Sequence, residues 1–162
     1  MYSTTEYALT NELDLFVEPG APLCARYETI IRAPIRSVWQ LVADLERWPT
    51  WQPEVQRVVF DGPLTPGVPF HWNVAGVKVH SLLGMVKPPH KIGWTAVSPG
   101  LRAIHIWHFE EHPKGTLAIT EESLSGWLAR LLRITQPNKL ENALMKAMLT
   151  LKREAERRII PT

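Results

Sequence analysis

Hydrophobic and polar residues alternate along several short segments of this chain, a pattern that is typical of β-strands with one buried face. In residues 23–32, for example, Tyr27, Thr29 and Ile31 alternate with charged residues. Turns rich in glycine and proline separate the later segments, which span 55–60, 70–74, 77–86, 92–97, 103–110 and 116–124. Because these connections are short, we predict that the strands are antiparallel neighbours.

Two regions show the three-to-four spacing of amphipathic helices instead. After Pro34, residues 35–45 carry one apolar stripe, and Pro49 and Pro53 then limit residues 46–51 to a brief second helical turn. Near the end of the chain, residues 127–134 form one helical segment, and a longer helix follows the break at 136–138. The apolar stripe of the long helix comprises Leu140, Leu144, Met148, Leu151 and Ala155. We expect this stripe to pack on the concave face of the sheet.

The length of 162 residues is that of one domain. We expect an N-terminal extension over residues 1–22 and a single domain over 23–160. No apolar run approaches the roughly 18 residues that a membrane span needs, and the N-terminus lacks the pattern of a secretory signal. We therefore expect a soluble, cytoplasmic protein. Its single cysteine, Cys24, excludes an internal disulfide and a cysteine-based zinc site.

The net charge of +2 is unevenly distributed along the chain. From Trp127 onward there are eight lysines and arginines against three acids, so the last part of the chain is basic. These charges are spread over the helix and lack the aromatic interleaving or zinc-finger spacing of nucleic-acid motifs. We expect a solvated helix face and no nucleic-acid partner, with an adaptor that contacts a protein or an anionic membrane as an alternative.

The order of the predicted elements resembles the helix-grip fold. The segments that carry this resemblance are IRAPIRSVWQLVADLERWPTWQPEV (31–55), GVPFHW (67–72), IGWTAVSPGLRAIHIWHFEE (92–111), GTLAITEESLSG (115–126) and LTLKREAE (149–156). They are similar to the polyketide cyclase/dehydrase and lipid-transport branch of the START-like (SRPBCC) superfamily. The resemblance implies an α+β, START-like/Bet v 1-like fold. In it, a curved antiparallel sheet of about seven strands wraps around a long C-terminal helix, and two short helices follow the first strand.

The resemblance also implies an apolar cavity between the sheet and the long helix. Alternate residues of a strand share a face, and we take the bulkier apolar set of each strand as inward. This choice places the predicted binding residues of the strands on the inner face. It also turns ten further strand residues inward: Val74, Val79, Met85, Ile92, Ala96, Ala103, Phe109, Leu117, Ile119 and Ser123. The predicted ligand-binding residues are Trp39, Phe70, Trp72, Ser81, Leu83, Trp94, His105, Trp107, Glu121, Leu144 and Met148. Four of the seven tryptophans are in this set, so it describes an aromatic-walled pocket or, equally, a packed core.

Two ionisable residues, His105 and Glu121, fall on the predicted inner face. A histidine and a carboxylate in an apolar cavity would have shifted pKa values and could act as acid and base. They are weak catalytic candidates, because a shift of one residue in register exchanges His105 for His108 and Glu121 for Glu122. We assign no catalytic residue from the sequence.

The sequence shows no pattern typical of a metal site or of a phosphate-binding loop. The six histidines include no HExxH pair, His105 and His108 fall on opposite faces of one strand, and no glycine-rich loop would hold a phosphate. We expect no metal and no cofactor. The favoured function is binding, and potentially transport, of a hydrophobic small molecule such as a lipid or polyketide. The alternative is a polyketide cyclase/aromatase-type enzyme. We expect a monomer or homodimer without stable membrane insertion.

Overall fold

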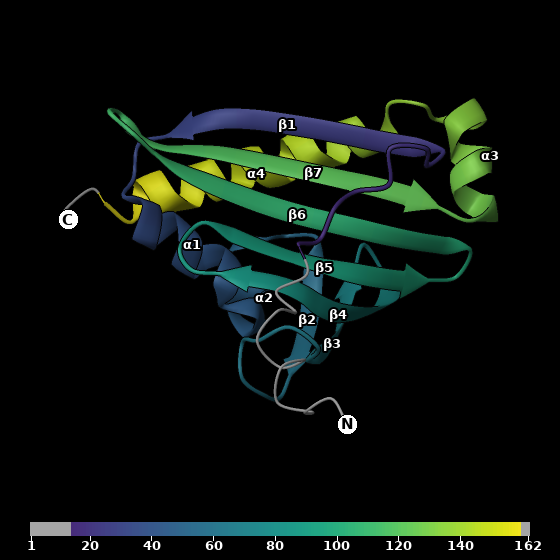
Figure 1. Ribbon diagram of the computed structural model, residues 1–162, viewed down its shortest axis with the longest axis horizontal. Helices are drawn as coiled ribbons and strands as arrows, with labels where there is room; N and C mark the ends of the chain where they lie inside the picture. The colour runs from purple at the N-terminus through teal and green to yellow at the C-terminus, as the bar shows by residue number, and fades with distance from the viewer. Residues whose placement is uncertain (1–13, 160–162) are drawn as a thin grey trace, which may run out of the picture.

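The computed structural model describes residues 14–159 (Figure 1). The strands are β1 (Leu23–Ile31), β2 (Val55–Phe60), β3 (Pro69–Val74), β4 (Val77–Lys87), β5 (Lys91–Ser98), β6 (Leu101–His112) and β7 (Gly115–Ser125). The helical elements are α1 (Ile35–Ala43), the 3-10 turn η1 (Leu45–Arg47), α2 (Trp48–Trp51), α3 (Trp127–Thr135) and α4 (Lys139–Arg157). Each strand and helix expected from the sequence is present within a few residues of its predicted bounds.

All seven strands form one antiparallel sheet in the order β1-β7-β6-β5-β4-β3-β2. The sheet curves, and α4 lies against its concave side (Figure 1). On the same side, α2 packs on β2, and α1 contacts β6, β7 and α4. Helix α3 lies at the opposite end of the sheet from α1. The predicted α+β fold, with a curved antiparallel sheet around a long C-terminal helix, is confirmed.

The register of the strands decides which side chains face α4. Residues paired across two antiparallel strands point to the same face. Trp94 on β5 stands opposite His105 on β6, and Ile92 stands opposite Trp107. Phe70 on β3 likewise stands opposite Ser81 on β4. The inward faces predicted for β3, β5 and β6 are therefore correct.

Two parts of the face prediction are wrong. A β-bulge between Leu83 and Met85 shifts the alternation of β4, so that Met85 stands opposite Gly93 on the outer face. On β7 the whole alternation is reversed, because His105 pairs with Glu122 and Glu121 pairs with outward Ile106. The β7 residues assigned inward, Leu117, Ile119, Glu121 and Ser123, therefore lie on the outer face.

The core occupies the space between the sheet, α1, α2 and α4. Among its fully buried side chains are Trp48, Phe70, Phe109, Met148 and Leu151. A smaller cluster lies beneath α3 and the start of α4, where Leu23, Leu132, Leu140 and Leu144 pack together. This second cluster closes the end of the sheet that α1 and α2 leave uncovered.

Residues 14–22 run over the outer face of the sheet before β1 begins (Figure 1). The side chain of Leu15 lies over Gly84 and Gly93, where an added Cβ would come within 3.1 Å and 3.0 Å of Leu15 Cδ2. The backbone N–H of Glu18 donates to Ser123 Oγ at 3.1 Å. This part of the predicted extension therefore packs on the domain, and residues 1–13 lie outside the described residues.

Helix α4 offers a matched test of where the core lies, because Met148 is fully buried and Met145, one turn earlier, is 39% exposed. We expect Met148→Ala to lower the free energy of unfolding by about 2–5 kcal/mol, since it removes a buried side chain and leaves a cavity. Met145→Ala should change it by less than about 0.5 kcal/mol. Urea denaturation of both variants measures the difference, and equal losses would contradict the observed packing of α4.

Candidate functional site

A cavity of about 250 Å³ lies between the inner face of the sheet and α4. Its lining comprises Gln52, Pro53, Glu54, Val55, Trp72, Val74, Val79, Trp94, Ala96, Ser98, Leu101, Ala103, His105, Glu122, Leu124, Ala143, Leu144, Lys146, Ala147 and Thr150. The strands contribute aromatic and aliphatic side chains, and α4 contributes small ones, chiefly Ala143 and Ala147. The space exists because alanines stand where larger residues would fill the gap between helix and sheet.

His105 is held on the cavity wall by a hydrogen bond to Thr120, the inward residue two positions before Glu122 on β7. The Thr120 hydroxyl donates its proton to the Ile106 carbonyl oxygen at 3.3 Å. It therefore accepts a hydrogen bond from His105 Nε2–H at 2.8 Å. In this tautomer Nδ1 carries no proton. The ring thus presents an unprotonated nitrogen on the side of Glu122.

Glu122 stands directly opposite His105 across the β6–β7 pair. Its Oε2 lies 3.9 Å from His105 Nδ1, and the side chains are only 13% (His105) and 18% (Glu122) exposed. Burial lowers the pKa of His105 to about 3. Burial also raises the pKa of Glu122 to about 8. At neutral pH the pair is therefore an uncharged imidazole beside a protonated carboxyl group, which can respectively accept and donate a proton.

Aromatic rings surround this pair and limit the cavity. The Trp94 ring centroid lies 5.0 Å from that of His105, and the Trp107 centroid lies 5.5 Å from it on the other side. Trp48 of α2 contacts both Trp72 and Trp94, with centroid distances of 5.3 Å and 5.2 Å. Because Trp48 is 2% exposed, it fills the α2 side of the sheet's concavity and restricts open space to the other side.

An ion pair lies beside the opening of the cavity. Lys146 Nζ of α4 is 2.5 Å from Glu54 Oε1, which precedes β2. Both side chains are more than half exposed, so the pair lies at the surface and contributes little to stability. It connects α4 to the loop between α2 and β2, and because both residues line the cavity and are exposed, the cavity reaches the surface here.

Of the predicted ligand-binding residues, the structure brings Trp72, Trp94, His105 and Leu144 together on the cavity wall. Six others, Trp39, Phe70, Ser81, Leu83, Trp107 and Met148, are buried around it without lining it. Ser81 accepts a hydrogen bond from Trp72 Nε1 at 3.0 Å and thereby orients that ring. These six residues are buried in the domain and do not line the cavity, and all but Ser81 belong to its main hydrophobic core.

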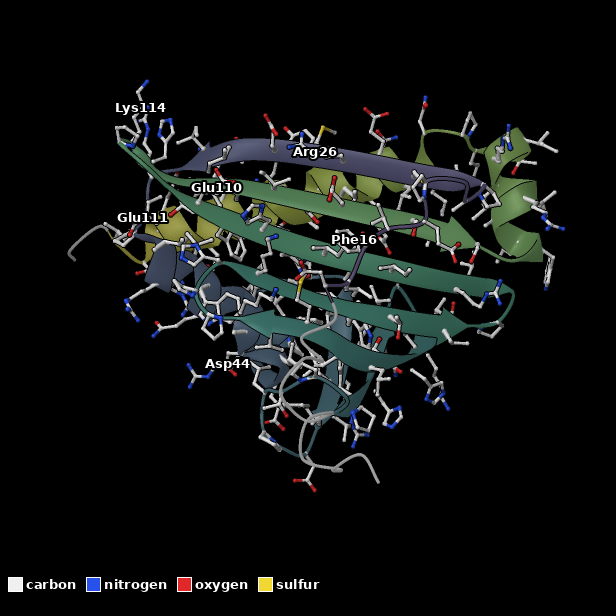
Figure 2. All side chains as sticks on the ribbon, in the orientation of Figure 1. Phe16, Arg26, Asp44, Glu110, Glu111 and Lys114 are labelled. Atoms are coloured by element: carbon white, nitrogen blue, oxygen red, sulfur yellow. The ribbon has the colours of Figure 1, made fainter. Side chains whose placement is uncertain are left out.

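The inward position predicted for Glu121 is wrong. Its carboxylate lies 3.5 Å from Arg26 Nε, and its side chain is 39% exposed. Arg26, its cross-strand neighbour on β1, projects from the face of the sheet turned away from α4 (Figure 2). The pair anticipated as His105 and Glu121 is therefore His105 and Glu122.

Sequence reasoning also missed Thr120 and, on α4, every lining residue except Leu144. One signal was available for β7. A two-residue turn at Pro113 and Lys114 pairs His112 with Gly115, and counting back along both strands places His105 opposite Glu122.

The described part of the chain contains neither a cluster of metal-binding side chains nor a membrane-spanning helix. Within residues 14–159, no three histidine, cysteine, aspartate or glutamate side chains are grouped so that they could hold a metal ion. Over the same residues, no helix is both long enough and apolar enough to cross a bilayer.

The curved sheet, the C-terminal helix against it and the two short helices after β1 define a START-like, helix-grip fold. The sequence matches the family described as polyketide cyclase/dehydrase and lipid transport over residues 23–156, and the chain belongs to that family. No curated protein matches the sequence significantly.

Several solved structures share this fold. A hypothetical protein of Helicobacter pylori superposes with a TM-score of 0.74 at 18% identity, over 85% of this chain and 90% of that one. The Zhui aromatase/cyclase of a Streptomyces species gives 0.69 at 17% identity, over 85% and 95%. A START superfamily protein of Mycobacterium smegmatis gives 0.64 at 13% identity, over 83% and 97%. At these identities the likeness extends to the fold and no further.

The shifted pKa of Glu122 predicts how stability depends on pH. The folded protein keeps this proton up to about pH 8, whereas the unfolded chain loses it near 4.5, so Glu122 lowers the free energy of unfolding as pH rises between these values. His105, whose pKa is lowered from 6.5 to about 3, acts in the opposite direction below pH 6.5 and offsets this effect there. We therefore expect the net decline between about pH 6.5 and 8. The contribution of Glu122 reaches at most about 1.4 kcal/mol per pH unit. Glu122→Gln should remove this contribution, as chemical denaturation across the same pH range would measure.

Glu121→Gln is the matched control, because it makes the same change one residue away on the outer face. It should leave the decline between about pH 6.5 and 8 in place. If Glu121→Gln removed the decline and Glu122→Gln did not, the assignment of Glu122 to the cavity would be contradicted.

Proposed function

We propose that this protein binds an uncharged hydrophobic small molecule in the cavity between the sheet and α4. The observation that carries the proposal is the cavity itself, a mainly apolar space of about 250 Å³ with an opening at one end. An apolar cavity with a few convergent polar groups is the usual form of a small-molecule site. Membership of a family described by polyketide cyclisation and lipid transport supports the same function.

The volume indicates the size of the ligand. An apolar cavity of about 150 Å³ holds benzene, and sites for drug-sized ligands begin at about 300 Å³. The 250 Å³ here lies between these values and suits a molecule of about two fused rings. A diacyl lipid is too large to be enclosed, although one part of a longer molecule can enter while the rest extends through the opening.

The polar groups indicate the chemistry of the ligand. A protonated Glu122 donates a hydrogen bond and His105 Nδ1 accepts one, so a hydroxyl or carbonyl group on the ligand can be satisfied here. A ligand anion would have to lose its hydration beside two neutral groups, which is unfavourable. The rings of Trp72 and Trp94 suit a flat aromatic body. A cytoplasmic location, a monomeric or homodimeric state and the absence of cofactor and nucleic-acid partners remain predictions from the sequence.

Two matched probes test this proposal. We expect 2-naphthol to bind at least tenfold more tightly than 2-naphthoate at neutral pH, because only the anion carries a charge that the site leaves unpaired. Isothermal titration measures both affinities. Ala103→Phe fills the cavity and should abolish binding, whereas Ile104→Phe, on the opposite face of β6, should preserve it. Binding that survives Ala103→Phe would place the ligand elsewhere.

A second function, proton-transfer catalysis on the bound molecule, is favoured by one specific observation. His105 Nδ1, a proton acceptor, and Glu122, a proton donor, face the same cavity 3.9 Å apart. With a ketone in the cavity lying against both groups, His105 would remove a proton from the carbon next to the carbonyl group while Glu122 protonates the carbonyl oxygen. The enol so formed is the nucleophile of an aldol cyclisation, which accords with the family's description.

Deuterium exchange into 2-tetralone, a bicyclic ketone, tests this chemistry without knowledge of the natural substrate. We expect the protein in D₂O to accelerate exchange at the carbons next to the carbonyl, followed by proton NMR. His105→Ala and Glu122→Gln should each reduce the acceleration by about 10²-fold or more, the usual contribution of a positioned acid or base. Glu121→Gln should retain it. Exchange at the rate of buffer alone would leave the protein a binder rather than a catalyst.

A further inference from the structure

Helix α3 exposes a row of large apolar side chains. Trp127 is 65% exposed, Leu131 48% and Ile134 81%. Their spacing of four and three residues places them on one side of the helix. No other helix of residues 14–159 exposes three large apolar side chains on one side to this extent. We call these three residues the α3 stripe.

The opposite side of α3 is packed firmly on the domain. Leu132 is buried in the cluster formed with Leu140 and Leu144, and Ala129 is also fully buried. The N–H of Leu128 donates to the Gly100 carbonyl oxygen at 3.2 Å, and the Trp127 ring lies so close to Gly100 that an added Cβ would come within 2.8 Å of it. The α3 stripe is therefore presented by an anchored helix, at one end of the molecule (Figure 1).

The charges on α3 are all positive. Arg130 and Arg133 lie on the flank of the α3 stripe, and the helix contains no acidic residue. Neither arginine forms an ion pair with any described residue. An exposed apolar stripe bordered by unpaired arginines is the pattern of a helix that lies in the interface of an anionic membrane.

The basic residues of α4 are arranged differently. Lys146 pairs with Glu54, Lys152 pairs with Glu156, and Arg157 and Arg158 both pair with Glu154. The three carboxylates of these pairs balance three of the six positive charges in residues 139–158. The contact with an anionic surface considered from the sequence is thus better supported at α3 than at α4.

We propose that α3 docks the protein on an anionic lipid surface. The α3 stripe enters the boundary between headgroups and acyl chains, while Arg130 and Arg133 extend to the lipid phosphates. This surface lies outside the cavity, and the proposal stands whether or not the cavity binds a ligand.

Docking at α3 would bring the cavity to the membrane. Leu101, Leu124 and Leu144 line the cavity and also belong to the cluster beneath α3. This layer and α3 itself separate the α3 stripe from the cavity. A hydrophobic molecule that leaves the bilayer beside α3 would therefore start close to the cavity.

Vesicle co-sedimentation tests the docking surface directly. We expect the full chain to bind vesicles of phosphatidylcholine with phosphatidylglycerol much more tightly than vesicles of phosphatidylcholine alone, and added salt should weaken the binding. The Arg130→Gln, Arg133→Gln double variant should bind the anionic vesicles about 25-fold more weakly, at about fivefold for each arginine. Ile134→Ser should also weaken binding, because it removes the most exposed apolar side chain of the stripe.

Controls match each change at a distant site. Arg153→Gln removes an exposed α4 arginine, and Val59→Ser removes an apolar side chain that is 44% exposed on β2. Both should bind vesicles like the wild type, and circular dichroism should show that all variants are folded. Binding of 2-naphthol should be unchanged in the α3 variants, which separates a failure of docking from a failure of the cavity.

Three results would overturn the proposal. One is equal binding of the wild type to neutral and anionic vesicles. Another is a loss of binding in the control variants as large as that in the α3 variants. The third is a protein that does not bind vesicles but sediments as a dimer that Ile134→Ser dissociates, which would assign α3 to an interface between two copies of the chain.

Discussion

The hydrogen-bond register between β6 and β7 determines which polar groups reach the interior of this protein. With His112 opposite Gly115, His105 falls opposite Glu122 and Trp107 opposite Thr120, all on the face that α4 covers. A shift of one residue would turn Glu122 outward and bring Glu121 in its place. The steric fit of Gly115 reinforces this register, because a Cβ there would come within 2.2 Å of the Ile31 carbonyl oxygen on β1.

Burial then sets the chemistry of the residues that the register selects. An ionised histidine or carboxylate would lose hydration on this aromatic wall, so both groups are held in their neutral forms. The hydrogen bond with Thr120 fixes the imidazole tautomer and directs its basic nitrogen toward Glu122. The ionised form of Glu122 is less stable in the folded protein than in the solvated, unfolded chain. A buried carboxyl group that costs stability at higher pH is typical of a site retained for function.

The fold was predictable from the sequence because its signals are local. Alternation, turns and helical spacing located every element, and bulky Trp94 and Trp107 set the faces of their strands correctly. The rule that the bulkier apolar side chains point inward failed on β7. Its outer face carries apolar Ile119 and also Ser123, which is buried where Glu18 bonds to it. Its inner face carries Thr116, Ala118 and Thr120. Small and polar residues stand inside because Ala118 faces Phe109 and both threonines form buried hydrogen bonds. The resemblance implied a cavity, but its size and most of its lining could not be predicted, because they depend on how closely α4 approaches the sheet.

The central claim is that the inner face of the sheet binds an uncharged aromatic molecule against His105 and Glu122. A crystal structure of the protein grown with 2-naphthol tests it most directly. The account predicts that the rings lie beside Trp94 between the sheet and α4, with the hydroxyl group within hydrogen-bonding distance of Glu122 or His105 Nδ1. A cavity that holds only ordered water, or that is closed by repacked side chains while the ligand lies elsewhere, would contradict it.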